Sequence, residues 1–457
     1  MDYSAANTAL WSPLVQISII AVTLLAATMI RRRVPGVRQS LLPTAVIAGF
    51  MVLILKLLNV LPVNVGFMEA VTYHCIAIGF IAMSLRLPEK SEEAGTSQVG
   101  MRSGAIIVSS YLIQGVAGLL ISIGLSYTIM PNLFKASGIL LPLAFGQGPG
   151  QANNTGTTYE VTWGFAGGRS YGLALAAMGY ICACVVGIII LNYLVRKGKI
   201  TRINHDELSG SVTVDTFQAA NELPVSESVD RFSIQACLVV GVYLLTYLVT
   251  KALTGALDAY APGVGKLVNS LLWGFNFIVG SAFAMLVRVI LAKLTDKQII
   301  HHQFQNNYLL SRISGAAFDV MVVAGIASIE PEELSGLMLP FILMTIAGAI
   351  VTLIHLDFVS RRVYKGYYYE GLISMYGMMT GTISSGVLLL REIDPQMKTP
   401  AANNLVVGSS FGILFGIPML VLIGLAPKST LMLFVTLAAL AIYYVILLWV
   451  AVGRQKK

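Results

Sequence analysis

Charged residues are scarce in this chain of 457 residues. Asp, Glu, Lys and Arg make up 11% of the sequence, whereas hydrophobic residues make up 56% and the mean hydropathy is +0.77. So few charges cannot cover the surface of a water-soluble globule of this length. The sequence therefore predicts a protein whose main solvent is lipid.

Cysteines are also few, and all four lie inside apolar segments: Cys75, Cys182, Cys184 and Cys237. A thiol packs there as a small apolar side chain. Cys182 and Cys184 have no histidine or further cysteine near them in sequence, which argues against a zinc site. The excess of Lys and Arg, a formal charge of +8, gathers at the ends of apolar runs and forms no stripe with aromatic residues. We therefore expect no disulfide framework, metal centre, organic cofactor or nucleic-acid partner.

Signatures of intramembrane enzymes are missing from the apolar runs. We find no HExxH motif, paired aspartates or Ser/His pair within them. A channel would more naturally repeat identical filter segments or carry rings of charge, which this chain does not show internally. The sequence thus predicts that the protein is not an enzyme.

Long apolar runs are what the sequence does contain. Each is about 20 residues long, as a helix that crosses a bilayer requires, and none shows the ten-residue alternation of a transmembrane barrel. We therefore expect an all-α membrane protein with about 11 transmembrane helices. The predicted spans are residues 13–30, 42–62, 69–86, 103–130, 170–195, 231–254, 265–294, 307–328, 335–359, 402–425 and 429–451.

Lys and Arg are distributed unevenly between the connections. If the N-terminus lies outside, most of them, Arg31 to Arg33 among them, fall on the cytoplasmic side, where basic flanks normally remain. Few fall on the outer side, Lys56 and Arg169 being examples. The first apolar run precedes its basic residues, whereas a secretory signal has them first, so we expect it to stay as a span. The pattern predicts a multi-pass inner-membrane protein with the N-terminus outside and the C-terminus in the cytoplasm.

Two apolar segments are too short to cross a bilayer. Residues 138–145 run into the sequence GQGPGQANNTG, and residues 371–376 run into GMMTGTISSG. The first of these apolar runs would reach about 12 Å as a helix, less than half of the membrane. We predict re-entrant hairpins at about residues 138–156, entering from outside, and about residues 371–388, entering from inside.

The two hairpins occupy equivalent places in the chain. Each follows four predicted spans and precedes a fifth, and the two halves begin on opposite sides of the membrane. Inverted repeats of this kind are typical of secondary transporters. We predict inverted repeats over residues 1–195 and 231–425, a polar cytoplasmic linker over residues 196–230, and an additional C-terminal helix and tail over residues 426–457.

The interrupted segments carry groups that bind ions. Irregular backbone at membrane depth occurs where protein or a water-filled cavity satisfies it. Free helix N-termini attract carboxylates, and carbonyl and hydroxyl oxygens suit a hard cation such as Na⁺. A single Gly-rich stretch often serves close packing, but two at equivalent places favour a binding site. The predicted substrate-binding residues are Gln147, Gly148, Gly150, Gln151, Asn153, Asn154, Thr155, Thr380, Gly381, Thr382, Ser384 and Ser385.

Asp319 lies inside the eighth predicted span, where a bare carboxylate costs several kcal/mol. We interpret it as the ion-coupling residue, for Na⁺ or for a proton. Asp319, Asn154 and Thr382 are the predicted sodium ligands. The alternative is a structural aspartate that is hydrogen-bonded in a groove of small residues around Gly315.

Three segments resemble the sodium/glutamate symporters of bacterial inner membranes: GQGPGQANNTG, GMMTG and SGAAFDVMVVAGIASI. Helix number, central linker and hairpin positions are similar to that family over most of the chain, excluding residues 429–457. The resemblance implies Na⁺-coupled uptake of glutamate or a related small anionic substrate by a homodimer, with an elevator-type movement of transport domains against a fixed scaffold. Proton-driven transport of another small carboxylate and a membrane channel are the alternatives.

Overall fold

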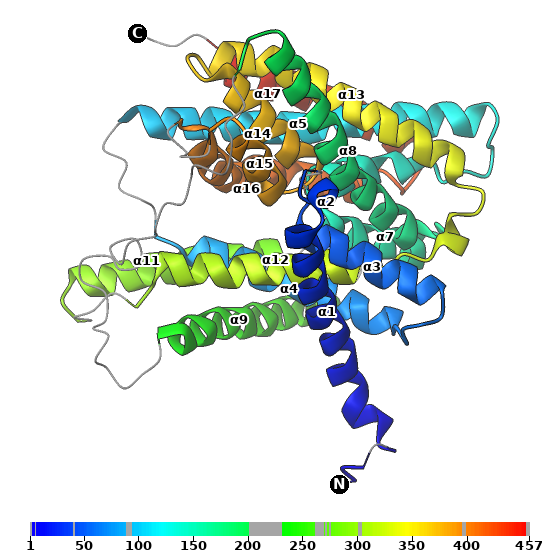
Figure 1. The fold of residues 1–457 in the computed structure, drawn as a ribbon, viewed down its shortest axis with the longest axis vertical. Coiled ribbons are helices and arrows are strands. Elements are labelled where there is room, and N and C mark those ends of the chain that lie inside the picture. The colour runs from blue at the N-terminus through cyan, green and yellow to red at the C-terminus, as the bar shows by residue number, and fades with distance from the viewer. Residues whose placement is uncertain are drawn as a thin grey trace. The chain divides into compact units, whose positions relative to one another are not determined.

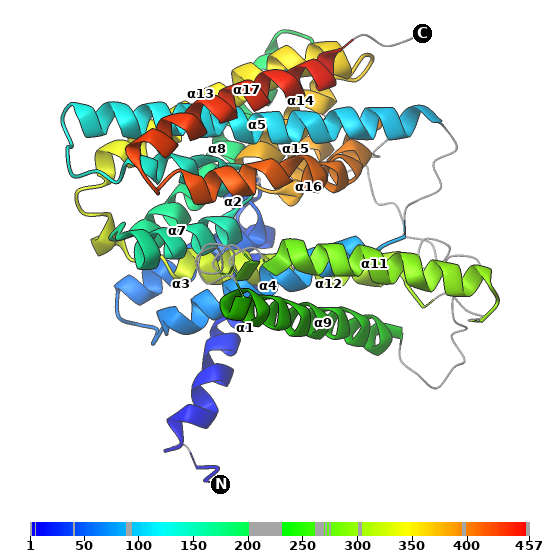
Figure 2. The ribbon, with the colours of Figure 1, turned by 180° about the vertical axis from the view of Figure 1, so that it is seen from behind.

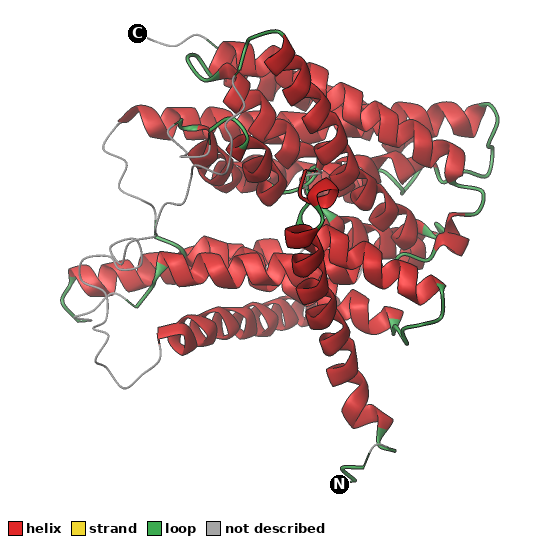
Figure 3. Ribbon diagram, viewed as in Figure 1, coloured by secondary structure: helices red, strands yellow, loops and turns green. Residues whose placement is uncertain are grey.

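The structure is a computed structural model, and its described part is helical throughout. Within that part the chain contains no strand (Figure 3), which confirms the all-α prediction. Most of the predicted linker, residues 201–230, lies outside the described residues, as does much of the start of the predicted seventh span. The described residues are 2–4, 6–39, 42–87, 94–200, 231–260, 269, 272–273, 276–299, 304–394 and 399–453.

Nine helices among these residues are long and apolar enough to cross a membrane, so the prediction of a multi-spanning membrane protein is confirmed. They are α1 (Thr8–Arg33), α4 (Val65–Leu85), α5 (Ala94–Tyr127), α8 (Gly168–Arg196), α9 (Arg231–Tyr260), α11 (Asn276–Asp296), α12 (Asn307–Ala327), α13 (Met338–Val363) and α17 (Thr430–Val452). The eleven predicted spans correspond to these helices together with α3 (Thr44–Leu57), which has only 14 residues, and the bent α16 (Ala401–Leu425). The count of eleven therefore stays a prediction.

The chain divides into two compact units, each of which contains segments from both predicted repeats. The division therefore does not follow the order of the chain, and the repeats stay a prediction. The larger unit contains Met1–Ala70, Glu93–Ile203 and Val322–Lys457, and the smaller unit contains Val71–Glu92 and Asn204–Met321.

In the smaller unit, α9, α11 and the adjoining parts of α4 and α12 lie side by side (Figure 2). Phe318 of α12 covers Gly79 of α4 so closely that a Cβ at Gly79 would lie 2.5 Å from the ring. Ser314 donates a hydrogen bond of 2.9 Å to the Gly79 carbonyl oxygen and ties the same two helices together. The shared core is apolar and consists of Ile81, Ala82, Leu85, Val239, Val242, Ala284 and Leu310.

Helix α5 is central in the larger unit. It packs against α13, α16 and α17, and also against the short helices η1 (Lys135–Ile139) and α6 (Leu140–Phe145) (Figure 1). The predicted additional helix, α17, belongs to this core because the Tyr444 hydroxyl lies 3.1 Å from Nδ1 of His355 on α13. Nε2 of the same imidazole lies 3.0 Å from Oγ of Ser109 on α5, so the structure brings together a serine and a histidine that the sequence did not indicate as a pair. Three helices are thus joined by one buried polar chain.

Candidate functional site

The first short segment folds as a helical hairpin. Helices η1 and α6 lead to a break at residues 146–148, and α7 (Pro149–Trp163) leads back. The rings of Phe134, before η1, and Phe165, after α7, stack with their centroids 4.9 Å apart. Since the ends of both arms that lie away from the break meet, the arms lie side by side.

The returning arm of the first hairpin is helical through most of the Gly-rich stretch. Helix α7 begins at Pro149. Proline fits the first position of a helix because its missing N–H would have no intrahelical acceptor there. Within residues 146–156 only Gly148 takes a positive φ, 87°, which an L side chain rarely adopts. The break is therefore only three residues long, over residues 146–148.

The second short segment is also a helical hairpin, made of α14 (Tyr368–Thr380) and α15 (Ile383–Arg391). A Cβ at Gly386 would lie 2.4 Å from the carbonyl oxygen of Ser374. A Cβ at Gly377 would lie 2.9 Å from Cα of Gly386. The two arms therefore pack backbone against backbone and turn at Gly381 and Thr382.

Helix α8 runs alongside both hairpins. At its beginning, Gly172 contacts α7, since a Cβ there would lie 2.8 Å from the carbonyl oxygen of Ala152. Toward its end, Gly187 contacts α15, since a Cβ there would lie 2.7 Å from Cδ1 of Leu389. The two hairpins thus lie along opposite parts of one spanning helix.

The tips of both hairpins meet between these two contacts. A Cβ at Gly179 of α8 would lie 2.4 Å from the carbonyl oxygen of Thr380, at the end of α14. A Cβ at Gly148 would lie 3.9 Å from Cγ2 of Thr382 and 3.7 Å from the hydroxyl of Tyr180. Gly179 is about 17 Å along α8 from its first residue, at a rise of 1.5 Å per residue. The meeting point is therefore well inside a helix of membrane-spanning length.

The structure brings the two predicted sets of substrate-binding residues together at these tips. Gln147 is half-buried, and its companions in the first hairpin are buried. In the first hairpin they are Gln147 and Gly148 at the break and Gly150, Gln151, Asn153, Asn154 and Thr155 at the start of α7. In the second they are Thr380 at the end of α14, Gly381 and Thr382 at the break, and Ser384 and Ser385 at the start of α15.

Several polar atoms of these residues are buried without a hydrogen-bond partner among the described residues. They are Oε1 of Gln151, Oδ1 of Asn153, Oγ1 of Thr155 and Oγ of Ser385. The side chains are only 1%, 5%, 3% and 1% exposed, respectively. An unsatisfied buried polar group costs about 1–3 kcal/mol. A ligand or bound water that offered hydrogen bonds here would recover that cost.

The helix ends at the tips add a directional charge pattern. Helices α7 and α15 begin there, and α6 and α14 end there. The first N–H groups of a helix and its last carbonyl groups have no intrahelical partner. The helix dipole places partial positive charge at the former and partial negative charge at the latter. The arrangement can therefore hold a carboxylate and a cation close together.

Gln114 of α5 is a polar residue at this place that the sequence analysis did not single out. Its Nε2 donates hydrogen bonds of 2.7 Å to Oγ1 of Thr352 on α13 and 2.9 Å to the carbonyl oxygen of Met379 on α14. The side chain is fully buried, and its Oε1 has no hydrogen-bond partner in the described part of the chain. A lone glutamine in the apolar run SYLIQGVAGLL is the sequence signal that points to it.

Asp319 lies on α12 in the smaller unit. Its side chain is exposed in this chain, as are Arg312, Gly315 and Ala316, which share its face of the helix. Ser314 faces α4 instead, so it does not line a groove with Gly315 and Ala316. The assignment of Asp319 to ion coupling stays a prediction.

A cluster of ion pairs surrounds Arg169, at the end of the first hairpin that lies away from its tip. Nη1 of Arg169 lies 2.6 Å from Oε1 of Glu69, and Nη2 contacts Glu330 and lies 3.4 Å from Oε2 of Glu333. The Arg169 N–H donates a hydrogen bond of 3.0 Å to Oε2 of Glu160. These residues lie in or beside three connections that the sequence predicts on the outer side. The contacts place all three on one side of the unit.

Contacts at the opposite helix ends agree with the same scheme. Nη2 of Arg102, near the start of α5, donates a hydrogen bond of 3.0 Å to the carbonyl oxygen of Gly453, after α17. Nδ2 of Asn404, in α16, donates one of 2.8 Å to the hydroxyl of Tyr367, before α14. All four residues are predicted to lie near the cytoplasmic side. The contacts agree with the prediction that these helix ends lie on the same side of the membrane. That this side faces the cytoplasm stays a prediction.

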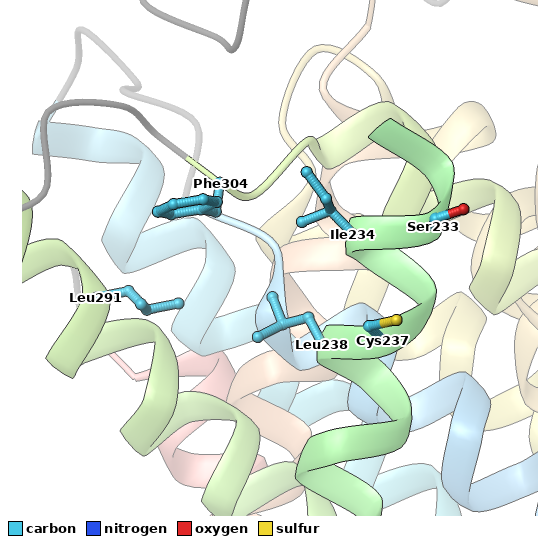
Figure 4. A pocket seen from close by; sticks show the side chains of 6 residues that line it. All are labelled: Ser233, Ile234, Cys237, Leu238, Leu291 and Phe304. Carbon is cyan, nitrogen blue, oxygen red and sulfur yellow. The ribbon is translucent and has the colours of Figure 1, made fainter. Parts of the chain in front are cut away.

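A pocket of about 320 Å³ in the smaller unit has a different character. Figure 4 shows the Ser233 hydroxyl directed away from the side chains of Ile234, Leu291 and Phe304. An apolar wall offers nothing that recognises an anion, so we assign no transport role to this pocket. It is lined by Ser233, Ile234, Cys237, Leu238, Leu291 and Phe304.

Comparison of the chain with known proteins adds no family assignment. No protein-family model and no curated protein matches it. The resemblance to sodium/glutamate symporters therefore rests on its three sequence segments and on the similar arrangement of spans, linker and hairpins.

Proposed function

We propose that this protein is a secondary active transporter whose substrate site lies where the two hairpin tips meet. The observation that carries the proposal is the proximity of Gly148 and Thr382 beside the middle part of α8. Interrupted helices that come from two repeats and end inside the bundle are the usual construction of such sites. A purely structural role for the tips would leave the buried, unpaired oxygens around them at a net cost in free energy.

The proposed substrate is glutamate or a related small anion. Helices α7 and α15 both begin at the tips, and their free N–H groups can donate hydrogen bonds to a carboxylate without a lysine or arginine. The amide and hydroxyl groups of Gln151, Asn153 and Thr155 can then bind the rest of a polar substrate. The sequence motifs favour Na⁺ as the coupling ion, with Asp319 as the residue that carries the coupling.

The proposed mechanism is elevator-type alternating access in a homodimer of the inner membrane. The N-terminus lies outside and the C-terminus in the cytoplasm, as the Lys and Arg distribution favours. Each hairpin would cover the site from one side, since the two lie along opposite parts of α8. The division of the chain into two compact units supports this scheme, because an elevator requires one part to move against another. We assign the moving part to the larger unit, which contains both hairpins.

Flux into proteoliposomes tests the function. Purified protein is reconstituted, and uptake of labelled glutamate, aspartate and small dicarboxylates is followed under an inward gradient of Na⁺, of protons or of neither. Accumulation that requires the Na⁺ gradient supports the proposal. Accumulation that requires only the proton gradient favours the proton-driven alternative, and passive flux that merely equilibrates favours a channel. Absence of flux for every substrate and gradient would contradict a transport function.

A further inference from the structure

Several oxygen atoms lie near the break between α14 and α15. They belong to residues other than the predicted sodium ligands. Because α14 ends at Thr380, the last four carbonyl groups of the helix, those of residues 377–380, have no N–H partner within it. The carbonyl oxygen of Met379 receives the hydrogen bond from Gln114. The carbonyl oxygen of Gly377 lies beside Gly381.

Gly381 leaves a space between the carbonyl oxygen of Gly377 and the hydroxyl oxygen of Ser385. A Cβ at this position would lie 2.8 Å from Oγ of Ser385 and 3.1 Å from the carbonyl oxygen of Gly377. Ser385 is only 1% exposed, and its Oγ has no hydrogen-bond partner in the described part of the chain. Two oxygens that come from the two arms of the hairpin therefore point to one small volume without a side chain.

We propose that this volume is a binding site for a monovalent cation, with the Gly377 carbonyl and the Ser385 hydroxyl as protein ligands. Carbonyl and hydroxyl oxygens are hard ligands that replace the water shell of a small cation such as Na⁺. The partial negative charge at the end of α14 also attracts a cation. Neither of these two ligands is a carboxylate, and neither residue is among the predicted sodium ligands Asp319, Asn154 and Thr382.

This site provides a physical route for coupling, a step that rests on the proposed function. The cation at the end of α14 would lie beside the tip where α7 and α15 begin. A bound positive charge there raises the affinity for a substrate carboxylate through Coulomb attraction, and the carboxylate raises the affinity for the cation in return. Neither ion needs to touch the other for this reciprocity to hold.

The test measures cation binding without substrate and without transport. The midpoint of thermal unfolding of purified protein is recorded in NaCl, KCl and choline chloride at one ionic strength. A ligand that binds only the folded state raises this midpoint in a saturable way. We expect a saturable rise with Na⁺ in the wild type and an apparent Na⁺ affinity at least about tenfold lower in Ser385→Ala, because one ligand is lost.

Two further variants make the result specific. Gly381→Ala fills the space with a methyl group and should lower the apparent Na⁺ affinity at least as strongly as Ser385→Ala. Ser374→Ala is the matched control, because this buried serine in the same hairpin already donates its hydroxyl to the Gly371 carbonyl oxygen at 3.2 Å. It should keep the wild-type Na⁺ affinity.

Two results would overturn the inference. The first is an unchanged Na⁺ response in both Ser385→Ala and Gly381→Ala, and the second is the absence of any Na⁺ response in the wild type. In either case gradient-driven uptake into proteoliposomes could still occur. The flux measurement therefore tests the proposed function separately from this cation site.

Discussion

Gly148 and Thr382 belong to opposite halves of the sequence and are neighbours in the structure, since a Cβ at Gly148 would lie 3.9 Å from Cγ2 of Thr382. Each occupies the break of a helical hairpin, and each is the residue before a helix that begins at the tip. The proximity of two helix N-termini and two helix C-termini inside a bundle of apolar helices is the structural basis of the proposed transport site.

Gly148 at the tip can be compared with a second glycine of similar backbone geometry. Gly148 and Gly164, at the end of α7, both have positive φ, 87° and 70°. Alanine at either position should cost about 1–3 kcal/mol of folding stability through backbone strain. Only Gly148→Ala should also raise KM for the substrate, because it alone lies at the tip. Uptake kinetics and thermal unfolding of both variants check this, and equal KM values would argue against a site at the first break.

Gln114 and Thr352 should be energetically coupled. Replacing Gln114 with methionine leaves the Met379 carbonyl oxygen without its partner, at a cost of about 1–3 kcal/mol. Thr352→Val removes only the other hydrogen bond of the same amide. A double-mutant cycle on the free energy of unfolding should give a coupling of about 0.5–1.5 kcal/mol. Strict additivity of the two variants would show that this bridge does not position the end of α14.

Asp319→Asn keeps the size of the side chain and removes its charge. If the carboxylate couples Na⁺ to transport, the apparent Na⁺ affinity for uptake should fall about tenfold or more, since Coulomb attraction is strong at low dielectric. If it carries a coupled proton, accumulation should lose its pH dependence while exchange of bound substrate persists. Asp296→Asn, at the exposed end of α11 in the same unit, is the control. An unchanged dependence on both ions in reconstituted Asp319→Asn would remove this residue from the mechanism.

The orientation of the chain can be tested in intact cells. In a background without the native cysteines, Ser209→Cys in the predicted cytoplasmic linker should not react with an impermeant thiol reagent. Tyr3→Cys, near the N-terminus that is predicted to lie outside, should react. Labelling of Ser209→Cys from outside would reverse the topology and remove the argument for inverted repeats.

Much of the helical architecture could be predicted from the sequence, because a spanning helix depends mainly on its own apolar length. Helix α8 at Gly168–Arg196 and helix α13 at Met338–Val363 lie close to the predicted spans. The hairpins were also recognisable, since eight apolar residues before a polar Gly-rich stretch cannot cross a bilayer. The exact positions of the breaks were not predictable, because a glycine-rich sequence also permits a helix once a proline has started it, as at Pro149.

The contacts of the site could not be predicted, because they depend on residues that are far apart in sequence. Nothing near Gly179 indicates that it lies against Thr380, and nothing near Gln114 indicates that it reaches Met379. The ion pairs of Arg169 join three separate connections in the same way. The compact units also differ from the predicted repeats, because packing joins segments from both halves of the chain.

The central claim is that the tips of both hairpins line one substrate site, and protection from thiol modification tests it most directly. Gln147→Cys and Thr382→Cys, both at half-buried positions, are made singly in a cysteine-free background, with Thr157→Cys on α7 as the control away from the tip. The rate of modification is measured against the concentration of the transported substrate in Na⁺. We expect substrate to slow the reaction at Gln147→Cys and Thr382→Cys with the same half-saturating concentration, and to leave Thr157→Cys unaffected. Protection at only one tip, or at neither, would contradict a shared site.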